Sequence, residues 1–252
     1  MRILTLALLT CCTVFLTLKS AAQEQHPGQH WDYGSTLGPS HWGELSPEFR
    51  VCSTGHRQSP IDIRNAKQAK LPELVFDYKP SPLRIVDNGH TIMINYAPGS
   101  FVVIGDQRYQ LKQFHFHRPS EEKINGKGFD MSAHLVHDDG KGKLAVVAIL
   151  LQAGEDNALI QEIWKDLPKE KAKEEVWDGV KIDLTQILPQ DRSYYTFAGS
   201  LTTPPCSEDV TWIVLKHSTS ISHAEIEQFS RLYRNDARPT QPLYGRTVQA
   251  SK

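Results

Sequence analysis

The sequence predicts a mainly β protein, built around one large, mostly antiparallel twisted sheet with short peripheral helices. Strand patterns predominate, helical periodicity occurs in only two stretches, and these helices do not alternate with strands as in a parallel βαβ fold. No linker-like segment, repeat or block of like charge divides the chain. Residues 23–252 are therefore expected to form a single domain.

The first 22 residues have the composition of a secretory signal peptide. Arg2 supplies a positive charge, residues 3–18 are largely apolar, and residues 20–22 are small enough for signal cleavage. No stop-transfer pattern follows, so we expect a periplasmic or secreted protein without a stable membrane span. Lipid attachment at Cys11 is a weaker alternative, because threonine is an unfavourable residue before a lipidated cysteine.

Strand patterns recur along most of the remaining chain. Shorter strands are expected at 92–96 and 101–104. Near-continuous apolar runs at 144–151 and 210–215 are typical of central strands that are buried on both faces. These runs predict the middle of the sheet.

The stretch 108–117 alternates clearly. Alternation predicts that its odd-numbered residues, from Tyr109 to His117, share one face, and that its even-numbered residues, from Gln110 to Phe116, share the other. We expect the aromatic face to pack into the core, which leaves the histidine face to line a cavity.

Two segments show helical features. In residues 158–167 the apolar side chains lie on one stripe, which consists of Leu159, Ile160, Ile163, Trp164 and Leu167. Farther on, Ser222 and Glu225 form a capping box, and Ile221 and Ile226 are placed to form its hydrophobic staple. Both helices are expected at the periphery.

The charge balance bears on the class of partner. The first 22 residues hold two of the 28 basic residues and none of the 29 acidic ones, so the rest has a formal net charge of −3. Binding to nucleic acid needs a basic surface, and we therefore expect no nucleic-acid partner. A neutral or small anionic substrate remains compatible with this charge.

Two cysteines, Cys52 and Cys206, lie outside the leader. In an exported protein they predict one disulfide, which would stabilise the fold by about 4–5 kcal/mol in the chain-entropy model. Two buried free thiols are the alternative. A bridge would fix the Thr-Thr-Pro-Pro segment that precedes Cys206.

Three histidines form a candidate metal site. His115 and His117 are spaced i, i+2 and point to the same side of a strand, and His134 follows 17 residues later with Ser132 and Val136 on its face. Three neutral imidazoles without a thiolate suit Zn²⁺. Three protein ligands leave the fourth tetrahedral position for water, which is typical of a catalytic zinc.

Ordered motifs extend from about residue 30 to residue 246. The main ones are Gln113–His117, Pro119–Glu121, Ala133–His137 and Gly199–Cys206. Together they resemble α-class carbonic anhydrases of bacterial type. The resemblance implies the fold of that family and a zinc enzyme that reversibly hydrates CO2 to bicarbonate and a proton.

The resemblance implies roles for five polar residues. His115, His117 and His134 are the zinc ligands. Thr202 hydrogen-bonds to the hydroxide that attacks CO2, and Glu121 accepts the proton of Thr202, so that the threonine oxygen can only accept from the nucleophile.

The resemblance also implies a substrate pocket and a route for the proton. CO2 is apolar and would lie against the apolar side chains Val136, Val146, Leu201 and Trp212, while Thr203 would contact bicarbonate. His90 matches the residue that carries the product proton away, a task that suits a histidine because its pKa lies near neutral.

Two departures from the pattern of the family bear on the zinc site and on the proton route, and a third, Phe197 in place of a common tyrosine, is minor. Gln113 fits as the partner of a ligand histidine, but Ser132 stands where a glutamate usually supports the ligand that corresponds to His134. Serine brings no negative charge, so weaker zinc retention or an altered pKa of the water is expected. Met93 replaces a polar residue and is expected to disturb the water chain to His90.

The same resemblance implies cis peptide bonds before Pro60 and Pro205 and a structural role for His137, which points away from the ligand face. A non-catalytic relative that binds zinc or a partner is the main alternative function. A zinc hydrolase of another kind is the second, but it would need a general base and Glu121 is already assigned. A monomer and a homodimer both remain open.

Overall fold

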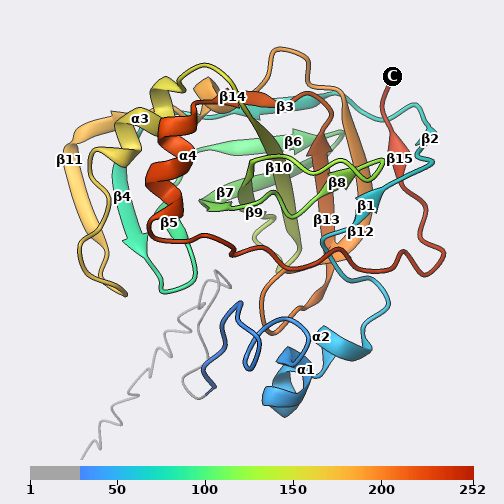
Figure 1. Ribbon diagram of the computed structural model, residues 1–252. Coiled ribbons are helices and arrows are strands. Elements are labelled where there is room, and N and C mark those ends of the chain that lie inside the picture. Colours follow the sequence, from blue (N-terminus) through green and yellow to red (C-terminus); the bar gives the residue numbers. More distant parts are fainter. Residues whose placement is uncertain (1–28) are drawn as a thin grey trace, which may run out of the picture.

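The computed structural model describes residues 29–252, so the predicted signal peptide lies outside the described residues. A twisted sheet of 13 strands dominates the fold (Figure 1). The strands along its main path, in spatial order, are β11 (Glu175–Ile182), β4 (Ser81–Asp87), β5 (Ile92–Asn95), β7 (Gln107–His117), β9 (Met131–Asp138), β10 (Leu144–Ala153), β13 (Glu208–Leu215), β12 (Tyr194–Ser200), β15 (Gln249–Ala250) and β2 (Lys67–Gln68).

Most neighbours in this sheet are antiparallel, as predicted, but the central pair β10 and β13 is parallel. The sheet is therefore mixed. Off its main path lie β3 (Leu74–Asp77), β6 (Phe101–Ile104) and β14 (Thr219–Ile221), and a separate pair is formed by β1 (Asp62–Ile63) and β8 (Lys123–Ile124). The predicted strands at 92–96, 101–104, 144–151 and 210–215 are all confirmed within a few residues.

The sheet separates two apolar cores, and β10 explains how. Its side chains alternate: Val147 and Ile149 enter the larger core, whereas Val146 and Ala148 enter a smaller core on the other face with Trp212. Both faces are buried, which accounts for the uninterrupted apolar run in the sequence.

The larger core is covered by α3 (Ala158–Trp164) and α4 (His223–Ser230), which lie together on one side of the sheet in Figure 1. The capping box of α4 is present as predicted. Helix α3 ends earlier than predicted, because Pro168 disfavours helical backbone before it, yet Leu167 still packs against the core. In the described part of the chain, no helix has the length and apolarity that a membrane crossing would require.

A bulge in β7 overturns one predicted detail. The register between β7 and β9 shifts between Leu111 and Gln113, so Lys112 is the extra residue. Tyr109 and Leu111 therefore share the larger core with the two phenylalanines of β7 instead of lying on the face of the histidines. Only the end of the strand, from Gln113 onward, has the predicted faces.

A small lobe lies below the sheet in Figure 1 and consists of α1 (Trp42–Leu45), η1 (Pro47–Phe49) and α2 (Val51–Thr54). The predicted disulfide between Cys52 and Cys206 is confirmed, and both cysteines pack in a third apolar cluster with Trp42 and Phe49. The disulfide joins this lobe to the segment that carries Thr202 and Thr203.

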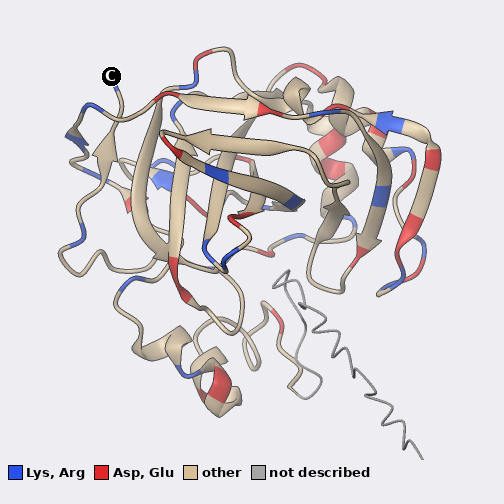
Figure 2. Cartoon of the chain, turned by 180° about the vertical axis from the view of Figure 1, so that it is seen from behind, with Lys and Arg blue, Asp and Glu red and all other residues tan. Residues whose placement is uncertain are grey.

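Charged residues of both signs are mixed over the loops and edge strands (Figure 2).

The predicted cis bonds before Pro60 and Pro205 are present, and a third precedes Pro119. The remaining helix-like turn is η2 (Leu184–Ile187).

Candidate metal centre

The three candidate ligands meet because β7 and β9 are antiparallel neighbours. His115 pairs directly with His134, and His117 pairs with Ser132. The ligand atoms of the three histidines lie within 4.8 Å of one another, and all three side chains are buried. This is the spacing that one metal ion needs, and it arises from the same-face alternation of two paired strands.

The second ring nitrogen of each histidine is held by an acceptor. The distances are 2.8 Å from His115 Nδ1 to Gln113 Oε1, 2.7 Å from His117 Nδ1 to the carbonyl of Asp236, and 2.9 Å from His134 Nε2 to Glu122 Oε1. An acceptor fixes the proton on the nitrogen that faces it, which turns the lone pair of the other nitrogen toward the centre.

The remaining nitrogens fit a cation. They are Nε2 of His115, Nε2 of His117 and Nδ1 of His134. His117 Nε2 is fully buried and has no hydrogen-bond partner within residues 29–252, which is costly unless a further group occupies the centre. This donor set, three imidazoles and no thiolate, suits Zn²⁺.

The electrostatics keep two rings neutral. Burial and the nearby His134 lower the pKa of His115 to about 3, and the same two causes hold the pKa of His117 well below its usual range. Burial also opposes charge on His134, but Glu122 and then Glu121 outweigh it and raise its pKa. Metal binding needs unprotonated ring nitrogens, so the first two ligands are ready.

Glu122 corrects the expectation about Ser132. Ser132 Oγ accepts from the backbone N–H of Glu121 at 3.4 Å, and the carboxylate partner of His134 is Glu122. The premise that His134 lacks a negatively charged partner is therefore wrong. The sequence contains two adjacent glutamates, Glu121 and Glu122, and only Glu121 was assigned a role from the motif. The second glutamate was the available signal for a carboxylate near His134.

Glu121 and Thr202 are brought together beside the three ligands. The Thr202 hydroxyl donates to the Glu121 carboxylate, whose Oε1 also accepts from the backbone N–H of Arg238 at 2.7 Å. Glu121 Oε2 lies 3.6 Å from His117 Nε2 and 3.8 Å from His134 Nδ1. Burial raises the pKa of Glu121 to about 7, and a cation in the centre would favour its ionised form.

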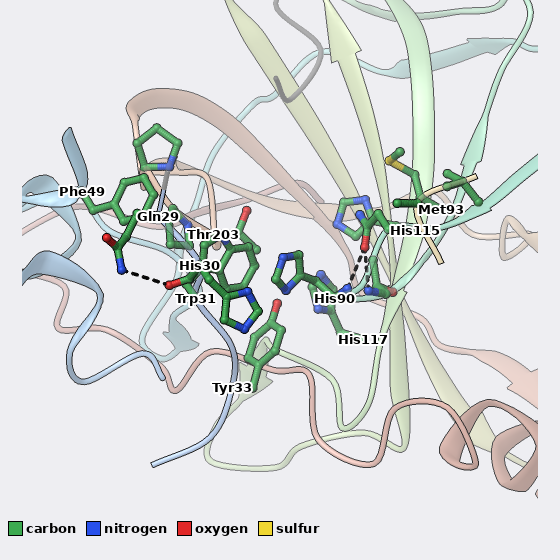
Figure 3. A pocket seen from close by; sticks show the side chains of 16 residues that line it. Gln29, His30, Trp31, Tyr33, Phe49, His90, Met93, His115, His117 and Thr203 are labelled. Carbon is green, nitrogen blue, oxygen red and sulfur yellow. Dashed lines mark hydrogen bonds between the residues drawn. The ribbon is translucent and has the colours of Figure 1, made fainter. Parts of the chain in front are cut away.

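Two hollows border the centre and share His115 and Thr203. The smaller is apolar and is lined by the predicted substrate residues Val136, Val146, Leu201 and Trp212. The larger is a cavity of about 620 Å³ that includes His90, Trp31 and Met93 (Figure 3). Met93 pairs with His115 across β5 and β7, so its thioether faces this cavity beside a ligand.

His90 lies on the wall of the larger cavity. Its ring stacks on Trp31 with a centroid distance of 3.6 Å and an angle of 6°, and its backbone N–H donates to Asn88 Oδ1 at 2.9 Å. Gly89 has a φ of +88°, which allows the tight turn before it. Burial, His30 and Lys171 lower the pKa of His90 to about 4.

His137 is separate from the centre. Its Nε2 is hydrogen-bonded to the Tyr78 hydroxyl at 2.7 Å, and its Nδ1 lies 3.3 Å from the carbonyl of Ala145. It is buried on the core side of β9, as its spacing from His134 predicts.

Known proteins resemble this chain along nearly its whole length. A family model of eukaryotic-type carbonic anhydrases matches residues 37–252. A carbonic anhydrase of Neisseria gonorrhoeae is 43% identical over 97% of this chain and 95% of the relative, and one of Nostoc is 42% identical over 87% and 85%. The α-carbonic anhydrase of Thermovibrio ammonificans, solved with the inhibitor sulfanilamide, has a TM-score of 0.85 at 40% identity and covers 89% of this chain and 100% of that one.

Proposed function

The chain belongs to the eukaryotic-type, α-class carbonic anhydrase family, and from this premise we propose that His115, His117 and His134 hold the Zn²⁺ at which it hydrates CO2. The reaction adds water to CO2 and yields bicarbonate and a proton. The observation that carries the proposal is the convergence of three buried ring nitrogens within 4.8 Å, each fixed by an acceptor on the opposite nitrogen. Zinc bound there would lower the pKa of a water molecule toward 7 and so supply a nucleophile at neutral pH.

Thr202 and Glu121 orient that nucleophile. Because the proton of Thr202 is donated to the Glu121 carboxylate, the threonine oxygen is left only as an acceptor. A hydroxide that donates its single proton to Thr202 has its lone pairs directed away from the threonine and toward the substrate. Arg238 fixes Glu121 through its backbone N–H and so supports this polarity.

The smaller hollow is the proposed CO2 site. The side chains of Val136, Val146, Leu201 and Trp212 form an apolar wall that suits a linear apolar molecule. The one polar group among them, Trp212 Nε1, already donates to the carbonyl of Ser200 at 2.9 Å. Thr203 lies where both hollows meet and is assigned to the product bicarbonate.

We assign removal of the proton to His90. Its ring borders the same cavity as two of the ligands, and the cavity connects them to the surface. In the stacked position its pKa of about 4 makes it a weak proton acceptor at neutral pH. Relay at neutral pH therefore requires a more hydrated position of the ring than the one against Trp31.

We also propose that the protein acts in the periplasm or outside the cell. The disulfide between Cys52 and Cys206 requires an oxidising compartment, and the composition of the first 22 residues fits a secretion signal. Fractionation of cells that produce the full chain, followed by mass determination of the released protein, tests this location and the cleavage site.

Stopped-flow CO2 hydration tests the metal assignment. The mature chain should contain one zinc per molecule by elemental analysis, lose its activity when dipicolinate removes the metal, and regain it with added Zn²⁺. The exposed residue His217 provides the matched control, since His217→Ala should keep both metal and activity, whereas His117→Ala should lose both. Full activity in metal-free protein would refute the proposal.

A further inference from the structure

Glu122 is a buried carboxylate that no step of the proposed reaction uses. Its side chain is 0% exposed, and Oε1 lies 2.9 Å from His134 Nε2. Its second oxygen is also buried and has no hydrogen-bond partner in the part of the chain that the structure describes. A carboxylate is costly to bury in this way unless it acts on a neighbouring charge or donor, and the donor it contacts is a proposed metal ligand.

The loop around Glu122 is built to hold it in place. Ser120 Oγ donates to the carbonyl of Glu122 at 2.9 Å and accepts from the backbone N–H of Phe129 at 2.8 Å. Lys123, the next residue, begins β8, which pairs with β1. These contacts fix the backbone on both sides of the glutamate, so its carboxylate approaches His134 from a rigid loop.

Ser132 lies on the same face of β9 as His134. Ser132 and His134 are two residues apart on β9, and Ser132 is fully buried while its hydroxyl contacts the backbone N–H of Glu121. A longer side chain at 132 could therefore reach the same ring. In this chain the carboxylate that contacts the ring comes from residue 122, and a small residue occupies position 132.

We propose, on the basis of the zinc site proposed above, that Glu122 is the positioning residue that fixes His134 for the metal. A carboxylate introduced at 132 would approach the same ring, so that positions 122 and 132 are alternative sources of one charge. Glu122 fixes the proton on His134 Nε2 and keeps Nδ1 directed at the centre. A single carboxylate is needed, and a second one beside it would add like-charge repulsion in a buried site.

The test compares four proteins, the wild type, Glu122→Gln, Ser132→Glu and the exchange Glu122→Gln/Ser132→Glu. Zinc affinity is measured by competition with a chelator, zinc release by its rate into dipicolinate, and coordination by the visible spectrum of the Co²⁺ form. Glu122→Gln should weaken zinc binding by roughly 10–100-fold. Ser132→Glu alone should bring no gain, and the exchange should recover most of the loss, with strong non-additivity between the two sites.

Glu73→Gln is the matched control, because it removes an exposed carboxylate of the same size and should leave zinc release unchanged. Thermal unfolding of the metal-free proteins separates loss of fold from loss of metal. If Glu122→Gln fails to fold, the exchange variant still decides, since a carboxylate at 132 must restore both fold and zinc retention. Wild-type zinc retention in Glu122→Gln, or an exchange variant as weak as the single one, would overturn the inference while the zinc enzyme stands. A wild type that binds no zinc would instead refute the proposed function.

Discussion

The three proposed metal ligands and the groups that support them come from different kinds of structure. His115 and His134 face each other on paired strands, so their separation is fixed by the spacing of the sheet. The acceptors that hold the three histidines come from a strand, a loop and the C-terminal segment. They are Gln113, Glu122 and the carbonyl of Asp236. The sheet thus sets where the nitrogens are, and acceptors from three different segments set which nitrogen carries the proton.

This difference suggests that the supports can change in sequence while the ligands stay. A backbone carbonyl supports His117 without any requirement on the side chain, and the carboxylate that supports His134 comes from a loop and not from the sheet. Changes to the strand-borne centre should therefore have large effects, and changes to the supporting segments should have graded ones.

The largest effect short of removing a ligand is expected at Thr202. Thr202→Val keeps the shape but removes the hydroxyl that links Glu121 to the nucleophile. We expect kcat/KM for CO2 hydration to fall by about 10²-fold, the cost of a misoriented reacting group, while zinc content stays unchanged. Stopped-flow assays with Thr247→Val, an exposed threonine, as control would check this. If Thr202→Val kept the kcat/KM of the wild type, the Thr202 hydroxyl would have no role in orienting the nucleophile.

A smaller effect is expected at His90, which belongs to a loop outside the sheet. His90→Ala should lower kcat by roughly tenfold in weak buffer and leave kcat/KM nearly unchanged, because proton removal follows the addition to CO2. Added imidazole should restore the rate. The control is His217→Ala, and a kcat that is insensitive to the variant at every buffer concentration would exclude His90 as the relay.

The stack of His90 on Trp31 gives a pH prediction. Burial lowers the pKa of His90 to about 4, so the stacked ring is neutral at pH 7 but accepts a proton weakly. Trp31→Ala should hydrate the ring and raise its pKa toward the ordinary value of about 6.5. The profile of kcat against pH should then gain an inflection near pH 6–7, with higher kcat above it and lower kcat below, where His90 is already protonated. A profile identical to that of the wild type would show that the stack does not control the relay.

Much of the centre was predictable from local patterns. Alternation placed His115, His117 and His134 correctly, because same-face positions in a strand do not depend on distant contacts. The bulge at Lys112 was missed, since an extra residue shows only against the partner strand. The sequence shows Glu122 only as a second glutamate beside Glu121, without its partner, and it gives no signal for Asp236, because a loop conformation and a backbone carbonyl acquire their partners only in the folded chain.

The smallest effect is expected at Asp236, where the supporting atom belongs to the backbone. Asp236→Asn keeps the carbonyl that holds His117 and keeps an oxygen able to accept from the backbone N–H of Arg118. Zinc release should therefore change by less than about threefold, well below the roughly 10–100-fold expected where a side chain supplies the support. Release rates into dipicolinate, measured beside Glu122→Gln, compare the two kinds of support directly. Equal losses in both variants would mean that the Asp236 side chain supports His117 as strongly as a direct partner does, and the distinction between backbone and side-chain support would fail.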